Sequence, residues 1–181
     1  MSSKALLVGG LASLLTVPIF AGVIVILAPD FDFEHLSATA WTLIAIGSLA
    51  SLIAFFGLYY LFAGNDTLRI SMLVLAVVGI GLTLLPTASD LAYNGGSILW
   101  GGALLVAGYL LRTSPYSVWL SWLGLLGGVL FVVLGAAGLA DQKAIADAAN
   151  GVSSVVVLAW SIWIGWVMFK KSREATPASI G

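Results

Sequence analysis

The sequence has no cysteine, a single histidine and very little charge. The absence of cysteine excludes disulfide bonds, thiolate metal sites and cysteine nucleophiles. With His35 as its only histidine, the chain has no pair of histidines to bind a metal from one helix. Charged residues make up 8% of the 181 residues, against about 25% in typical soluble domains. The net charge is −1 and there is no long basic cluster, so we expect no nucleic-acid partner.

Hydrophobic residues, by contrast, make up 61% of the chain. A soluble chain of this size needs far more polar surface to cover its core. Long continuous apolar runs indicate membrane-spanning helices rather than barrel strands, and each span takes about 20 residues. We predict an all-α, polytopic transmembrane bundle of six helices within residues 1–170, followed by a disordered tail over 171–181. The helices are expected at about 5–27, 39–63, 70–88, 95–111, 117–140 and 152–169.

The distribution of charge predicts the orientation. In a six-helix chain, both ends and the even-numbered loops share one side of the membrane. Six of the seven basic residues fall on that side, namely Lys4, Arg69, Arg112, Lys170, Lys171 and Arg173. Most acidic residues fall on the other side, where Lys143 is the only base. Because basic residues mark the cytoplasmic side, we predict a multi-pass protein of the cell (cytoplasmic) membrane with both termini in the cytoplasm.

No Asp, Glu, Lys, Arg or His lies inside the six predicted spans. Ionisable groups inside a membrane mark proton relays, ion paths and coupled transport, so their absence argues against a proton-coupled carrier, a redox pump or an intramembrane protease. The polar groups of the spans are mainly hydroxyls, such as Ser13, Thr16 and Ser51. They can line a path for a small neutral solute, although the sequence shows no continuous polar seam.

Three tryptophans, Trp100, Trp160 and Trp163, fall deep within the predicted helices. Their rings can bind a flat apolar ligand such as a quinone, a carotenoid or a lipid chain. The simpler interpretation is that they fill the bundle interior, because aromatic residues at helical spacing belong first of all to a core. The identity of any cofactor stays open.

Small residues recur at the four-residue spacing that lets membrane helices approach closely. The pairs are Gly47 with Ser51, Ser97 with Gly101, and Gly124 with Gly128. Their contacts can lie within one chain or between protomers, and the sequence does not distinguish the two. The fourth predicted helix is short and begins after Asn94 with a glycine pair, so it is also a candidate for a broken segment that faces a cavity.

The dense polar group of the sequence is Asp30, Asp32, Glu34 and His35, in the predicted outer loop between the first two helices. Three carboxylates and an imidazole are suitable ligands for a hard divalent cation such as calcium or magnesium. The alternation of acids with phenylalanines also suits a loop at the membrane interface. Exclusion of charge from the hydrocarbon is enough to explain acidic residues at this position.

Several segments resemble a large group of uncharacterised six-helix bacterial and archaeal membrane proteins, classified together as a domain of unknown function. The similar segments are GVIVILAP (22–29), HLSATAW (35–41), GLYY (57–60), the stretch 112–128 and WSIWIGW (160–166). This resemblance covers most of the chain and implies a six-helix fold. It implies no activity, so it assigns a role to no residue.

These features lead to three expectations for function. The first is a non-catalytic membrane protein, either an accessory or structural subunit of a membrane complex or a homo-oligomer, with a protein partner or self-association. The second is a channel or facilitator for a small neutral solute. The third is an outer-face metal-dependent enzyme that uses the acidic loop.

Overall fold

The computed structural model describes residues 3–27, 38–62, 64–84 and 90–175, and all regular structure within these ranges is helical. Six helices follow one another as α1 (Ser3–Leu27), α2 (Ala38–Leu61), α3 (Asp66–Thr83), α4 (Asp90–Arg112), α5 (Val118–Leu139) and α6 (Lys143–Glu174). Each is long and apolar enough to cross a membrane. The predicted all-α class and the predicted number of candidate spans are therefore confirmed.

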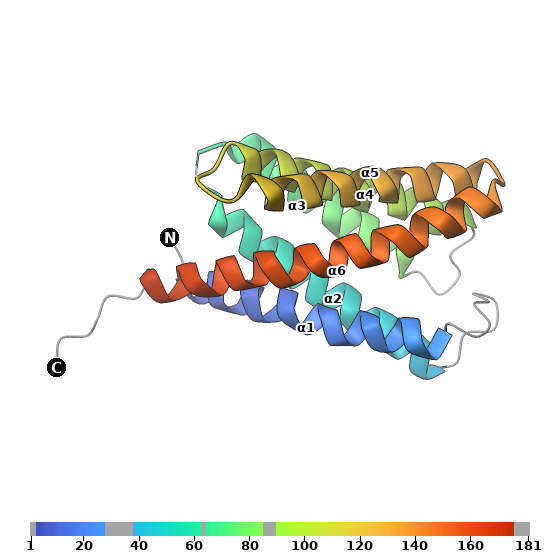
Figure 1. Ribbon diagram of the computed structural model, residues 1–181, viewed down its shortest axis with the longest axis horizontal. Helices are drawn as coiled ribbons and strands as arrows, with labels where there is room; N and C mark the ends of the chain where they lie inside the picture. Colours follow the sequence, from blue (N-terminus) through green and yellow to red (C-terminus); the bar gives the residue numbers. More distant parts are fainter. Residues whose placement is uncertain (1–2, 28–37, 63, 85–89, 176–181) are drawn as a thin grey trace.

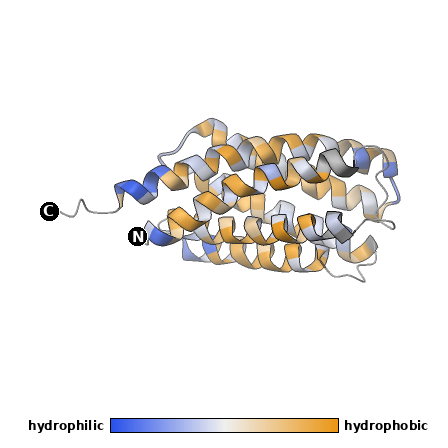
Figure 2. Cartoon of the chain, turned by 90° about the horizontal axis from the view of Figure 1, so that it is seen from below, coloured by the Kyte–Doolittle hydropathy of each residue, from blue (hydrophilic) through white to orange (hydrophobic). Residues whose placement is uncertain are grey.

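The helices form a closed circuit in chain order. Each packs against the next, and α6 returns to pack against α1 (Figure 1). Both termini lie at the same end of the bundle, as an even number of antiparallel helices requires. Apolar residues cover the length of the helices, while hydrophilic residues gather at the two ends (Figure 2). This distribution is the one that a hydrocarbon layer around the bundle requires.

Glycines let α1 approach both of its neighbours closely. A Cβ atom on Gly57 of α2 would lie 2.7 Å from the Cα of Gly9 in α1 and 2.8 Å from the Sδ of Met168 in α6. One residue further along α1, a Cβ on Gly10 would lie 2.9 Å from the carbonyl oxygen of Gly165 in α6. At these crossings backbone meets backbone, the arrangement by which membrane helices gain packing contacts without a hydrophobic driving force.

The predicted small-residue pairs contribute to contacts within the chain. A Cβ on Gly101 of α4 would meet the carbonyl oxygen of Gly128 in α5 at 2.7 Å, and Gly124 of α5 faces Gly108 of α4. Gly47 of α2 contacts side chains of α1. The predicted set joins α4 to α5 through Gly101, Gly124 and Gly128 and joins α2 to α1 through Gly47, while Ser51 and Ser97 are buried. Within the described residues, the four glycines of these pairs are used in internal packing.

The fourth helix is longer than predicted. It begins at Asp90 instead of residue 95 and runs for 23 residues, so Asn94 and Ser97 lie inside it. Helix α4 is continuous over these residues, so the alternative of a broken segment does not hold. Gly96 lies at a helix crossing, because a Cβ there would meet the carbonyl oxygen of Gly79 in α3 at 2.7 Å.

The other boundaries differ where polar residues extend an apolar run. Helix α6 spans 32 residues from Lys143 to Glu174, which includes residues 171–174 of the predicted tail. At 1.5 Å per residue it is about 48 Å long, slightly more than a bilayer with its headgroup layers. Helix α3 begins at Asp66, four residues earlier than predicted, because the side chain of Asn65 accepts a hydrogen bond from the backbone N–H of Leu68 at 3.2 Å.

Candidate functional site

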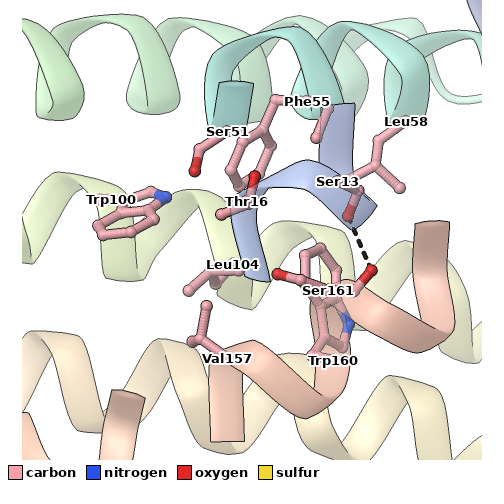
Figure 3. A pocket seen from close by; sticks show the side chains of 11 residues that line it. Ser13, Thr16, Ser51, Phe55, Leu58, Trp100, Leu104, Val157, Trp160 and Ser161 are labelled. Carbon is pink, nitrogen blue, oxygen red and sulfur yellow. Dashed lines mark hydrogen bonds between the residues drawn. The ribbon is translucent and has the colours of Figure 1, made fainter. Parts of the chain in front are cut away.

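The centre of the bundle contains a small cavity between four helices. Its walls come from α1, α2, α4 and α6, and this set of residues defines the central cavity: Ser13, Thr16, Ser51, Ala54, Phe55, Leu58, Trp100, Leu104, Val157, Trp160 and Ser161 (Figure 3). It has about 20 Å³ of room for the centre of a water-sized molecule. By that measure, a cavity needs about 10–15 Å³ to hold one water. The central cavity therefore has room for one very small molecule.

Four hydroxyl groups from three helices meet at this cavity. The Oγ of Ser13 donates to the carbonyl oxygen of Ser161 at 2.9 Å and joins α1 to α6. The hydroxyls of Thr16 and Ser51 donate to the carbonyl oxygens four residues earlier in their own helices, both at 2.9 Å. These three hydroxyls donate their protons to backbone carbonyl oxygens. Their own oxygens therefore keep lone pairs that can accept hydrogen bonds.

The central cavity carries no ionisable group among the described residues that line it. A charged solute would lose its hydration there without a counter-charge, which is strongly unfavourable in a low-dielectric interior. The chemistry of these walls is therefore limited to hydrogen bonding and apolar contact. They are suited to a neutral molecule and contain no general acid or base.

Trp100 brings a buried hydrogen-bond donor to the cavity. Its ring packs against Phe131 with the ring centroids 4.5 Å apart. The indole nitrogen lies on the ring edge that faces Thr16 (Figure 3). This nitrogen is buried and has no hydrogen-bond partner among the described residues. An unsatisfied buried donor costs about 1–3 kcal/mol, so each one in a native structure needs an explanation.

Trp160 carries a second buried indole nitrogen without a partner in the described part of the chain. It lies on the side of the ring turned away from Trp100 (Figure 3). A Cβ built on Gly124 of α5 would lie 3.0 Å from this nitrogen. The two tryptophans therefore both line the central cavity, but they present their N–H groups to different surroundings.

The three deep tryptophans predicted from the sequence do not form one site. Trp100 and Trp160 line the cavity, whereas Trp163 is 38% exposed on the outer surface of the bundle. The cavity as it stands has no room for a quinone ring or a carotenoid. A larger apolar ligand would have to lie on the outer surface or separate the helices.

The predicted metal ligands Asp30, Asp32, Glu34 and His35 lie outside the described residues. Within residues 3–27, 38–62, 64–84 and 90–175, no group of three His, Cys, Asp or Glu side chains is close enough to bind a metal ion. The metal site in the outer loop stays a prediction.

The sequence did not reveal the cavity, although it contained a signal for part of it. Ser13 and Thr16 are three residues apart, so they share one face of a helix. What the spacing does not show is that this face meets Ser51 of α2 and Ser161 of α6. That convergence depends on how the helices are ordered around the bundle.

Comparisons with protein-family models, with curated proteins and with solved structures give no match to this chain. The resemblance to uncharacterised six-helix membrane proteins therefore stays a prediction.

Proposed function

We propose that this multi-pass membrane protein is a facilitator that lets a small uncharged solute cross the bilayer, with the central cavity as its binding site. The observation that carries the proposal is the meeting of four hydroxyls and the Trp100 N–H in a cavity with room for one very small molecule. A neutral solute that leaves water loses hydrogen bonds, each loss costing about 1–3 kcal/mol. Polar groups inside the bundle replace part of that loss.

The proposal is tested by solute flux into liposomes that contain the purified protein. Swelling rates are measured under inward gradients of water and of uncharged solutes of increasing size, against protein-free liposomes. We expect faster entry of the smallest solutes and no effect on the larger ones. Rates equal to those of protein-free liposomes for every solute would contradict the proposal.

A matched pair of variants connects the flux to the cavity. Ser51→Leu places a bulky side chain in the cavity and is expected to reduce flux to the level of protein-free liposomes. Ser154→Leu is the control, because Ser154 lies outside the cavity and its hydroxyl also donates to the carbonyl four residues earlier, at 2.8 Å. This control should conduct like the unmodified protein.

We further propose the cell (inner, cytoplasmic) membrane as the location, with both termini in the cytoplasm. The support is the end of the bundle that carries the termini, where three arginines lie over aromatic rings. The distances from guanidinium carbon to ring centroid are 4.1 Å for Arg69 on Tyr59, 5.1 Å for Arg112 on Trp122 and 4.4 Å for Arg173 on Phe169. Basic and aromatic side chains together are typical of a cytoplasmic membrane interface.

An accessory or structural role in a membrane complex, or self-association, stays a prediction. The glycine pairs that suggested it in the sequence are used within the chain, so they no longer favour a second protomer. Native mass spectrometry from mild detergent tests this role. A second copy or a partner chain bound to the protein would support it, and a monomer alone would count against it.

A further inference from the structure

We infer that the indole N–H of Trp100 is the donor that holds the solute, and that the solute is a neutral hydride of oxygen or nitrogen, namely water or ammonia. This inference rests on the proposed function for the route across the membrane. It adds the binding residue and the chemical class of ligand. Trp100 has two roles here, because its ring lies against Phe131 while its nitrogen faces the cavity.

The Trp100 N–H is buried and has no acceptor among the described residues. The nearby hydroxyls of Thr16 and Ser51 already donate to backbone carbonyls. A ligand with a lone pair in the cavity would supply the acceptor that the protein itself does not.

The walls of the central cavity are complementary to a small hydride. Besides the Trp100 N–H, they carry the hydroxyl oxygens of Ser13, Thr16 and Ser51, which keep lone pairs because their protons are engaged elsewhere. The complementary ligand has one lone pair for Trp100 and several protons for the hydroxyl oxygens. Water and ammonia meet this requirement and fit the available space. Ammonium does not, because it has no lone pair and carries a charge that the walls do not balance.

The test compares Trp100→Phe with Trp163→Phe in protein-containing liposomes. Each variant replaces one indole, but only Trp100 lines the central cavity, whereas Trp163 is 38% exposed on the outer surface. Water flux is followed by light scattering under an osmotic gradient, and ammonia flux by an internal pH dye. We expect Trp100→Phe to reduce the flux of the conducted hydride by about fivefold or more, the factor that loss of one such hydrogen bond implies. We expect Trp163→Phe to change it by less than about twofold.

The water and ammonia measurements identify which hydride is conducted. The variants separate the inference from the proposed function. If the unmodified protein conducts a small solute and Trp100→Phe conducts it equally well, the inference fails while the facilitator proposal stands. The inference also fails if the protein conducts only solutes without N–H or O–H groups.

A second measurement does not depend on flux. In protein labelled with ¹⁵N-tryptophan and held in nanodiscs, the indole signal of Trp100 is assigned from its loss in Trp100→Phe. We expect a magnetisation-transfer cross-peak from this N–H to bound water, or a shift of its signal when ammonia is added. The Trp160 signal should show neither effect. A Trp100 signal that shows neither would overturn the inference even if flux is observed.

Discussion

At the scale of single residues, the turn between α5 and α6 contains the one non-glycine residue of the described chain with a positive φ. Asp141 has φ 56° and follows directly after the C-cap residue Ala140 of α5. The backbone N–H of Gln142 donates to the carbonyl of Ala137 at 2.8 Å, and that of Asp141 to Gly138 at 3.2 Å. This left-handed conformation after a helix is most readily adopted by glycine.

We predict that Asp141→Gly stabilises the protein by up to about 1 kcal/mol, because glycine adopts the left-handed conformation without a Cβ penalty. The measurement is reversible unfolding in mixed detergent micelles. Asp147→Gly is the control, since Asp147 is exposed in helix α6, where glycine is expected to destabilise by about 0.5–1 kcal/mol. A lower free energy of unfolding for Asp141→Gly would show that its side chain contributes more than its conformation costs.

At the scale of elements, the close crossings of glycine-containing helices determine how the six helices fit together. Helix α1 shows the contrast within one element. A Cβ on Gly9 would lie 2.5 Å from the Cα of Gly57 in α2, whereas a Cβ on Gly22 would have nothing within 4 Å. The same residue type therefore serves packing at one position and leaves open space at the other.

We predict that Gly9→Ala destabilises the protein by about 1–3 kcal/mol, the usual cost of overpacking, because backbone rather than a flexible side chain stands in the way. Gly22→Ala in the same helix is expected to be neutral or stabilising, by up to about 1 kcal/mol, since alanine is the better helix former. Unfolding in mixed micelles measures both. Equal effects of the two substitutions would mean that the crossing of α1 and α2 tolerates an additional methyl group.

The elements also show what the sequence can predict and what it cannot. The helices were predictable because span length and apolar composition are sufficient to identify a membrane helix. The boundaries of α4 and α6 were not, because there polar residues such as Asp90 and Lys143 continue a helix beyond its apolar run. The order of contacts was not predictable either. Helices apolar on every side carry no amphipathic pattern to show which face is internal.

The lack of an amphipathic pattern also explains which parts of the candidate site could be predicted from the sequence. Gly47, Gly101, Gly124 and Gly128 were predictable as packing residues from their spacing, and the structure adds their partners. The hydroxyl cluster was not predictable. Its members lie up to 148 residues apart, as the hydrogen bond from Ser13 to Ser161 shows, and only the order of the helices brings them together.

At the scale of the whole molecule, the closed circuit of six helices separates two chemically different ends. One end carries both termini together with Arg69 at the start of α3 and Arg112 at the end of α4. The opposite end carries the turn between α5 and α6, with Asp141 and Lys143. Under the positive-inside rule, we expect the basic end to face the cytoplasm.

The absence of cysteine makes this orientation directly testable, because a single introduced cysteine is labelled without background. Thr67 and Gln142 are exposed, at the start of α3 and in the turn before α6, and therefore lie at opposite ends of the bundle. We predict that a membrane-impermeant maleimide labels Gln142→Cys in intact spheroplasts and labels Thr67→Cys only after permeabilisation, since the basic end should face the cytoplasm. The unmodified protein is the control for background labelling. The reverse pattern would place the basic end outside, and labelling of both sites in sealed cells would mean that the chain between them does not cross the bilayer an odd number of times.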